Sequence, residues 1–312
     1  MADQRHRVHA ATAPAPGAAP GAEPTQPDGD VGLFGPSSVT WRVHDDPSMI
    51  IAGIRALLLQ AVHPLAMTGV AHHSTYRTDP WGRLRRTVDY VDTITYGSTD
   101  AAHCAAARVR RVHAGIHGVD AGTGRPYRAT DPELLLWVHV SEVESFLSTT
   151  RRCGLALTDR QADTYFAEQV RAAELVGIPA RDVPSSRAEV EHYLTRMRPG
   201  LRVTAASREA VGIILRPPMP RWVALATPAR PAWSALAAIA VGMLPGWTRR
   251  LYGLPDVAAV ELIASLCGKA ARAALLGLPR SLFQTPGALR RPALPAPTDE
   301  PTGACIDLTH TG

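Results

Sequence analysis

The sequence predicts an all-α protein built as a single helical bundle domain. Apolar residues recur with a helical period through most of residues 31–285, and no series of alternating β-branched runs joined by hairpin dipeptides interrupts them. The chain has 312 residues, of which 46% are hydrophobic and 20% charged, so it can bury a large core. No apolar run of about eighteen residues is free of charges and prolines. We therefore expect no integral membrane span and only peripheral membrane contact, if any.

Proline, glycine and alanine dominate both ends of the chain. Such segments cannot bury enough apolar area to offset the entropy of ordering them, so we expect disordered arms over residues 1–30 and 286–312. The first arm has no apolar stretch of the kind found in secretory signals, and the four cysteines form no CxxC pair. Both features predict a cytoplasmic protein with reduced thiols.

Arginine supplies almost all of the positive charge. Of the 33 basic residues only Lys269 is a lysine, and the net charge is +5. The arginines are spread along the chain without basic tails or interleaved aromatic residues, so the sequence predicts no nucleic-acid partner. The bias toward arginine and alanine is typical of a GC-rich, actinobacterial-type genome. No pattern in the sequence predicts an oligomeric state.

Periodicity and capping residues place the helices in order. Residues 49–71 are apolar almost all round, which predicts a central helix kinked where Pro64 lacks a backbone donor. Asp79 opens the second helix, and Ser98 or Thr99 caps the third. The helices expected after the first are residues 80–97, 99–118, 132–154 and 159–177, then shorter ones at 187–197, 204–215, 233–244 and 257–276.

The third helix carries an unusual set of polar residues beside small ones. His103, Arg110, His113 and His117 are separated by seven, three and four residues, which puts them on one stripe of the helix. The alanines beside this stripe would let a flat, bulky group such as a porphyrin approach the backbone closely. His113 is therefore a candidate axial ligand of haem iron, and a solvated polar face is the alternative.

A non-haem metal site is a second hypothesis for the same helix. His113 and His117 lie four residues apart, as in helical zinc sites, but Ala114 stands where the HExxH motif has glutamate. The zinc-protease interpretation therefore fails. The motifs of serine hydrolases, P-loop NTPases and Rossmann dinucleotide-binding proteins are missing from the sequence too.

The second helix and the segment before it offer candidates for the remaining walls of a pocket. Arg83 and Thr87 share one helix face and could point into a pocket as hydrogen-bond donors. His63, His72 and His73 lie on or just after the apolar central helix. They are candidate bases, because neutral imidazole can accept a proton near pH 7. A solvated helix face and satisfied core histidines are the alternatives.

Several segments resemble the oxygenase and rubber-oxygenase catalytic domain family, among them RVRRVHAGIHG, with its Arg-x-x-His pattern. This family includes bacterial proteins of the domain-of-unknown-function 2236 type, the latex clearing proteins and the fungal prenyl-cleaving oxygenase of mycophenolic acid biosynthesis. The similar segments are residues 57–91, 108–118, 124–139, 198–210 and 244–255, and the resemblance spans about residues 31–277. It implies a globin-like helical bundle that binds haem b and activates dioxygen to oxidise an apolar, often isoprenoid, substrate.

The resemblance also implies roles for individual residues. His113 corresponds to the family's proximal haem ligand, and Arg110 to the arginine that precedes it. Arg83 and Thr87 correspond to an arginine and a threonine of the distal pocket. Arg86 stands where relatives can supply a lysine as a sixth ligand, and it cannot ligate iron because it stays protonated.

Two further histidines compete with His113 for the iron, namely His117 one turn later and His139 on the next long helix. The family's distal glutamate has no counterpart, since residues 49–78 contain no Asp or Glu, so a histidine would have to act as the base. We expect a haem b-dependent oxygenase or peroxygenase that uses dioxygen and a small apolar substrate, isoprenoid or polyketide-like. A sensor or carrier that binds haem or another ligand without turnover is the alternative.

Overall fold

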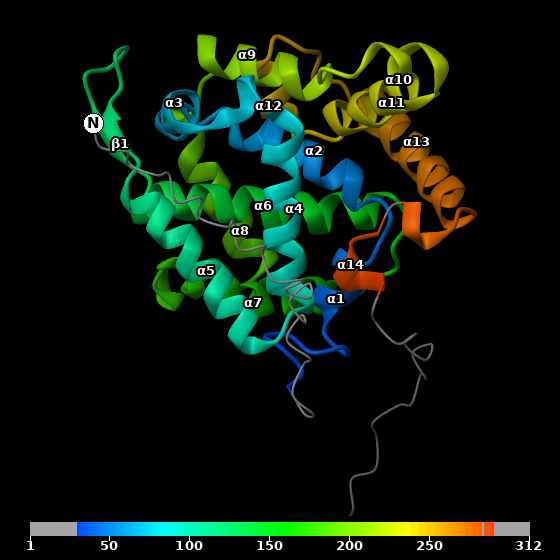
Figure 1. Cartoon of the computed structure of the whole chain (residues 1–312), viewed down its shortest axis with the longest axis horizontal. Coiled ribbons are helices and arrows are strands. Elements are labelled where there is room, and N and C mark those ends of the chain that lie inside the picture. Colours follow the sequence, from blue (N-terminus) through cyan, green and yellow to red (C-terminus); the bar gives the residue numbers. More distant parts are fainter. Residues whose placement is uncertain (1–29, 283, 290–312) are drawn as a thin grey trace, which may run out of the picture.

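The computed structural model describes residues 30–282 and 284–289, and this part of the chain is helical nearly throughout (Figure 1). Its α-helices are α1 (Val39–His44), α2 (Met49–Gln60), α3 (Pro64–His73), α4 (Pro80–Tyr96), α5 (Thr99–Ala114), α6 (Pro132–Arg152), α7 (Asp159–Val176), α8 (Arg187–Met197), α9 (Ala205–Leu215), α10 (Arg221–Ala226), α11 (Ala229–Gly242), α12 (Gly246–Leu251), α13 (Ala258–Leu276) and α14 (Pro286–Leu289). Two short strands, β1 (His117–Val119) and β2 (Pro126–Arg128), form one antiparallel hairpin. The predicted all-α class is confirmed.

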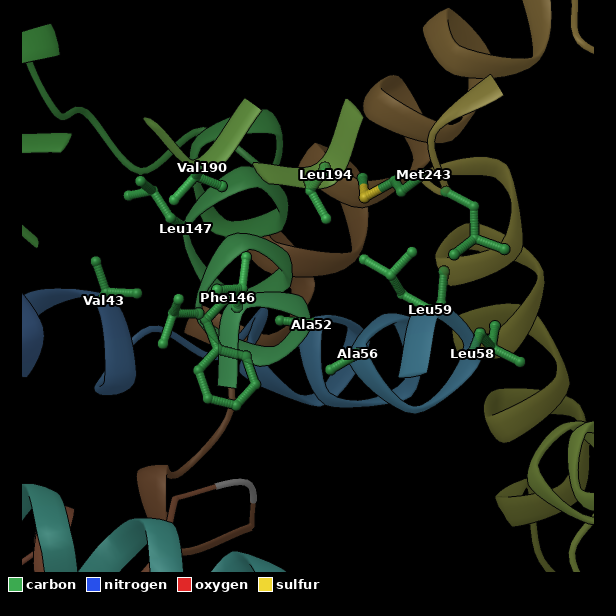
Figure 2. Close-up of a cluster of buried hydrophobic side chains, with 14 of the residues drawn as sticks. Val43, Ala52, Ala56, Leu58, Leu59, Phe146, Leu147, Val190, Leu194 and Met243 are labelled. Atoms are coloured by element: carbon green, nitrogen blue, oxygen red, sulfur yellow. The ribbon is translucent and has the colours of Figure 1, made fainter. Parts of the chain in front are cut away.

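The core is built around the packing of α2 against α6 near the middle of the molecule (Figure 1). Figure 2 shows Ala52 and Ala56 of α2 near Phe146 of α6, in a buried cluster that also includes Val190 of α8 and Met243. The small side chains on α2 allow the two helices to approach closely, and the larger ones around them fill the space between helices. This rigid pair forms one wall of the candidate site.

A buried ion pair joins the same two helices. Arg55 of α2 is 2% exposed and donates from both terminal nitrogens to the Glu144 carboxylate of α6, at 2.6 and 3.0 Å. Its remaining donors reach the Ser145 hydroxyl and the Met243 carbonyl oxygen. A guanidinium can be held in the interior because its charge is paired and its N–H groups find acceptors.

The apolar central helix that the sequence predicts over residues 49–71 is two helices in the structure. α2 ends at Gln60, α3 begins at Pro64, and their axes are bent by 105°. The kink is this sharp because Pro64 has no N–H to continue the ladder, while the His63 imidazole accepts from the Ala66 N–H and caps a new helix. In the described residues no single helix is long and apolar enough to cross a membrane; only this bent pair meets the criterion when the two are joined.

The predicted third helix also ends earlier than expected. α5 stops at Ala114, and His117 lies in β1, where it pairs with Arg128 of β2. The hairpin depends on Gly118, because a Cβ at that position would lie 2.7 Å from the Tyr127 hydroxyl oxygen. The sequence stripe from 103 to 117 is therefore broken before its last member.

The start of the segment assigned to the second arm belongs to the folded domain. Residues 286–289 form α14, where Ala288 is buried and the Gly287 N–H donates to the Asp92 carboxylate of α4 at 3.1 Å. The described residues include only Asp30 of the arm predicted over residues 1–30. The rest of the predicted tail also lies outside them.

Candidate functional site

A cavity of about 1340 Å³ lies between the α2–α6 pair and the helices α4 and α5. Small-molecule pockets typically measure about 300–1,000 Å³, so this one has room for a large cofactor and a second molecule. Its walls are mostly apolar, with Ile54 and Leu57 from α2, Val109 and Val112 from α5, and Val138 from α6. The polar side chains that interrupt these walls define what the cavity can bind.

Arg83 and Thr87 form the first polar group of the cavity, as their spacing on one helix face predicts. The Arg83 Nη1 donates to the Thr87 hydroxyl at 2.6 Å, and its Nε donates to the Ser74 hydroxyl at 2.9 Å. Burial lowers the pKa of Arg83, and the charge of Arg86 adds to that effect. Because the usual pKa of arginine is above 12, the guanidinium stays charged. Within the described residues its Nη2 has no partner, so it can serve a ligand.

His113 lies in the last turn of α5 and lines the same cavity. Its imidazole is half-buried and makes no hydrogen bond to any residue that the structure describes. Burial lowers the pKa of His113, and the nearby charge of Arg83 lowers it further. The ring is therefore neutral near pH 7, which leaves a nitrogen lone pair available to a metal.

The other three polar residues of the predicted stripe are not brought to the cavity, and the first of them, His103, is exposed on α5. Arg110 is exposed and donates to the Leu175 carbonyl oxygen at the end of α7, so it ties α5 to α7. His117 is exposed on β1 and is not part of the cavity wall. Of the candidates on this segment, the structure places only His113 where a cavity ligand could reach it.

The three candidate bases have different surroundings. His63 caps α3, packs at 5.7 Å against the Trp137 ring and does not line the cavity. His72 and His73 are exposed, and each has a ring nitrogen near the Tyr127 hydroxyl, at 3.0 and 3.3 Å. Only His73 contributes to the cavity wall.

Arg86 lies at the edge of the same cavity. Its guanidinium is exposed and donates to the Thr75 hydroxyl at 2.8 Å and to the Asp79 carboxylate at 3.3 Å. These two contacts hold Arg86 against the start of α4. A charge at this edge can attract an anionic group of a ligand without entering the apolar interior.

A second polar group, from α6, includes a residue that the sequence analysis missed. His139 and Glu142 lie one turn apart and both line the cavity. Burial lowers the pKa of His139 to about 4 and raises that of Glu142 to about 7. The His139 Nε2 is buried and has no hydrogen-bond partner in the described part of the chain. The spacing of three residues could have linked Glu142 to His139, but the resemblance places the distal carboxylate within residues 49–78.

No three His, Cys, Asp or Glu side chains come together as a metal site in the residues that the structure describes. The four imidazoles that line the cavity instead come from four different helices, and they are those of His44, His73, His113 and His139. The His113 group adds cationic and hydroxyl donors, and the His139 group adds a carboxyl.

Comparison with known proteins identifies one family. Its profile matches residues 41–274, more than half of the chain, and is described as the catalytic domain of ER-bound oxygenase mpaB/B′ and rubber oxygenase. No curated protein and no solved structure gave a significant match. The matched range includes every residue that lines the cavity, from His44 to Trp233.

Proposed function

The chain belongs to the family of mpaB-type and rubber-oxygenase catalytic domains, and from this we propose that it is a haem b-dependent oxygenase. Family membership supports the oxygenase role. The observation that carries the cofactor is the neutral, unpartnered imidazole of His113 in a large apolar cavity that it shares with Arg83 and Thr87. We propose dioxygen and a small apolar molecule, isoprenoid or polyketide-like, as the substrates.

The residues present fit a haem. A single imidazole donor would suit a haem, because the porphyrin itself already holds the iron and one side chain of the protein is enough to anchor it. The flank of α5 next to the cavity is small, since Ala105 lines it and Ala102 and Ala106 are fully buried behind it. The cavity is also large enough for the macrocycle. Arg86 and Arg108 at its wall offer cationic partners for the propionates.

His113 is the residue that would hold the iron, and haem would supply the dioxygen chemistry that side chains lack. Arg83 places a fixed positive charge and a free N–H in the same cavity, where negative charge that develops during oxidation is stabilised. Thr87 and Ser74 hold the guanidinium in place, so little reorganisation is needed. The apolar walls bind the substrate and exclude water.

We also propose His73 as the base among the three histidines first considered. It is the one of the three that contributes to the cavity wall. Its Nε2 lies 3.3 Å from the Tyr127 hydroxyl, which can orient the ring and exchange a proton with it. In this proposal His63 stabilises the start of α3, and His72 holds the Tyr127 hydroxyl.

The experiment that tests the proposal is the absorption spectrum of the purified protein and of its His113→Ala variant. We expect a Soret band in the wild type that is mostly lost in the variant and partly restored by added imidazole, because the cavity left by the side chain admits a free ligand. The variant should fold, since alanine is a good helix former. The matched control is His117→Ala, whose side chain lies outside the cavity wall, and His139→Ala tests the competing imidazole on α6.

Two results would contradict the proposal. A wild-type spectrum for His113→Ala, together with loss of the band in His139→Ala, would move the ligand to α6. Wild-type protein that shows no Soret band after supplementation with haemin would remove haem from the proposal altogether.

A further inference from the structure

The α6 side of the cavity contains a carboxyl group without a partner. Glu142 lines the cavity and neither of its oxygens accepts a hydrogen bond from another residue in the described chain. Both carboxyl oxygens retain solvent-accessible surface, so they face the open volume of the cavity and not a packed wall. A carboxyl group in such a place costs free energy unless a ligand satisfies it.

A phenol lies near this carboxyl. Tyr90 of α4 lines the cavity, and its hydroxyl has no hydrogen-bond partner in the part of the chain that the structure describes. Burial raises the pKa of Tyr90, and the charge of Glu142 adds to that effect. Glu142 and Tyr90 thus present an acceptor and a donor to one cavity, from α6 and from α4.

This polar group is separate from the proposed iron site. Tyr90 lies on α4 and Glu142 on α6, whereas the proposed iron ligand His113 lies in the last turn of α5. Apolar side chains of α2 and α5 line the same cavity. A molecule bound here would have its polar end at Glu142 and its apolar body directed along the cavity.

We propose that Glu142 and Tyr90 bind the hydroxyl group of an otherwise apolar alcohol, which is the substrate or product of the oxygenase. The hydroxyl donates to the Glu142 carboxylate and accepts from the Tyr90 O–H, so each unpartnered group gains one hydrogen bond. The inference rests on the proposed function only in giving the alcohol this role.

The charge of the cavity favours an alcohol over other head groups. A carboxylate ligand would be repelled by Glu142 and attracted to the arginines instead. An ammonium ion would share the cavity with the positive charges of Arg83, Arg86 and Arg108. A neutral hydroxyl avoids both penalties.

The test compares two isomers, decan-1-ol and 1-methoxynonane, which have the same atoms but differ in the hydroxyl donor. Binding to the purified, haem-loaded protein is measured by isothermal titration calorimetry at pH 7.5. We expect decan-1-ol to bind about tenfold or more tightly than the ether, because a hydrogen bond to a charged acceptor is among the stronger ones.

Variants of the cavity residues test which side chains cause the preference for decan-1-ol over the ether. Glu142→Leu should reduce the ratio of the two affinities to near one. Tyr90→Phe should weaken both ligands and leave their ratio nearly unchanged, because the ether oxygen also accepts from the phenol O–H. Glu142→Gln should keep part of the ratio, since the amide oxygen still accepts but carries no charge. The matched control is Glu133→Gln, an exposed residue of the same helix outside the cavity, which should leave the ratio unchanged.

Three outcomes would overturn the inference: an unchanged ratio in Glu142→Leu, no binding of decan-1-ol, or tighter binding of decylamine that Glu142→Gln abolishes. The last would make this group a site for a cation. The Soret band of each variant is recorded in parallel, so a failure of the haem proposal is seen separately from a failure of the alcohol site.

Discussion

Replacing Glu142 by glutamine should change how the stability of the protein depends on pH. Burial in the cavity raises the pKa of this carboxyl from 4.5 to about 7, so the folded protein holds a proton that the unfolded chain has lost between those values. The free energy of unfolding therefore falls as pH rises through this window and stays low above it. Glutamine does not titrate, so the variant escapes this loss.

The size of the effect follows from the same shift. One pKa unit corresponds to about 1.4 kcal/mol, and the whole shift to about 3 kcal/mol. The carboxyl is only half-buried, so screening by water in the cavity reduces this to about 2 kcal/mol. We expect the stability of Glu142→Gln minus that of the wild type to grow by about 2 kcal/mol between pH 4.5 and pH 8.

The assay is urea denaturation of both proteins across this pH range. Burial lowers the pKa of His63 and His139 to about 4, so these residues destabilise the fold as pH falls below 6.5. That slope runs in the opposite direction but is common to both proteins, and it cancels in their difference. A difference that stays flat with pH would refute the reasoning, as would an equal slope for Glu133→Gln, whose carboxyl is solvated.

Further predictions concern the other polar groups. Arg83→Ala should retain haem absorbance and lose about 100-fold or more in the turnover of an accepted substrate, as when a preorganised donor is removed. Thr87→Val should lose less, because it only positions that guanidinium. Glu144→Gln should cost about 3 kcal/mol in urea denaturation, because Arg55 keeps its buried charge without a counter-ion. The double variant Arg55→Met with Glu144→Leu should recover much of that loss, and its failure to do so would show that the pair is net stabilising.

Helix starts could be predicted from the sequence because capping is local. Asp79, Ser98, Asp131 and Thr158 each accept a hydrogen bond from a backbone N–H of the first turn that follows them. Gly177 ends α7 with a left-handed backbone, at a φ of 102°. Such interactions need only a few neighbouring residues, so the printed sequence contains all the information.

The ends and breaks that were missed depend on contacts from elsewhere in the chain. The stop of α5 is set with the hairpin, in which Tyr127 packs over Gly118. The break after α2 is completed by the Arg202 N–H, which donates to the Val62 carbonyl oxygen left free there, at 2.9 Å. Helical periodicity carries no information about these distant partners, so the helices predicted from it are too long in both places.

The site was predictable where one helix face decided it. Arg83 and Thr87 share a face of α4, and the structure places both in the cavity with His113. Helical spacing does not tell which face of α5 or α6 meets the cavity. For this reason Arg110 was grouped with His113, although it faces α7, and Glu142 was not considered.

In the proposed site, Glu142 binds the substrate and Arg83 assists its reaction, two tasks that a single distal glutamate would combine. Glu142 comes from α6, and its charge acts on Tyr90, whereas the charge that acts on His113 is that of Arg83. A group that interacts with Tyr90 can hold one end of a substrate without altering the electrostatics of the proposed iron ligand. Substitution of Glu142 should therefore change which molecules bind, and substitution of Arg83 should change how fast a bound molecule reacts. If Glu142→Leu slowed turnover of a saturating substrate as strongly as Arg83→Ala does, this division of tasks would be wrong, and Glu142 would have to act on the reacting atoms themselves.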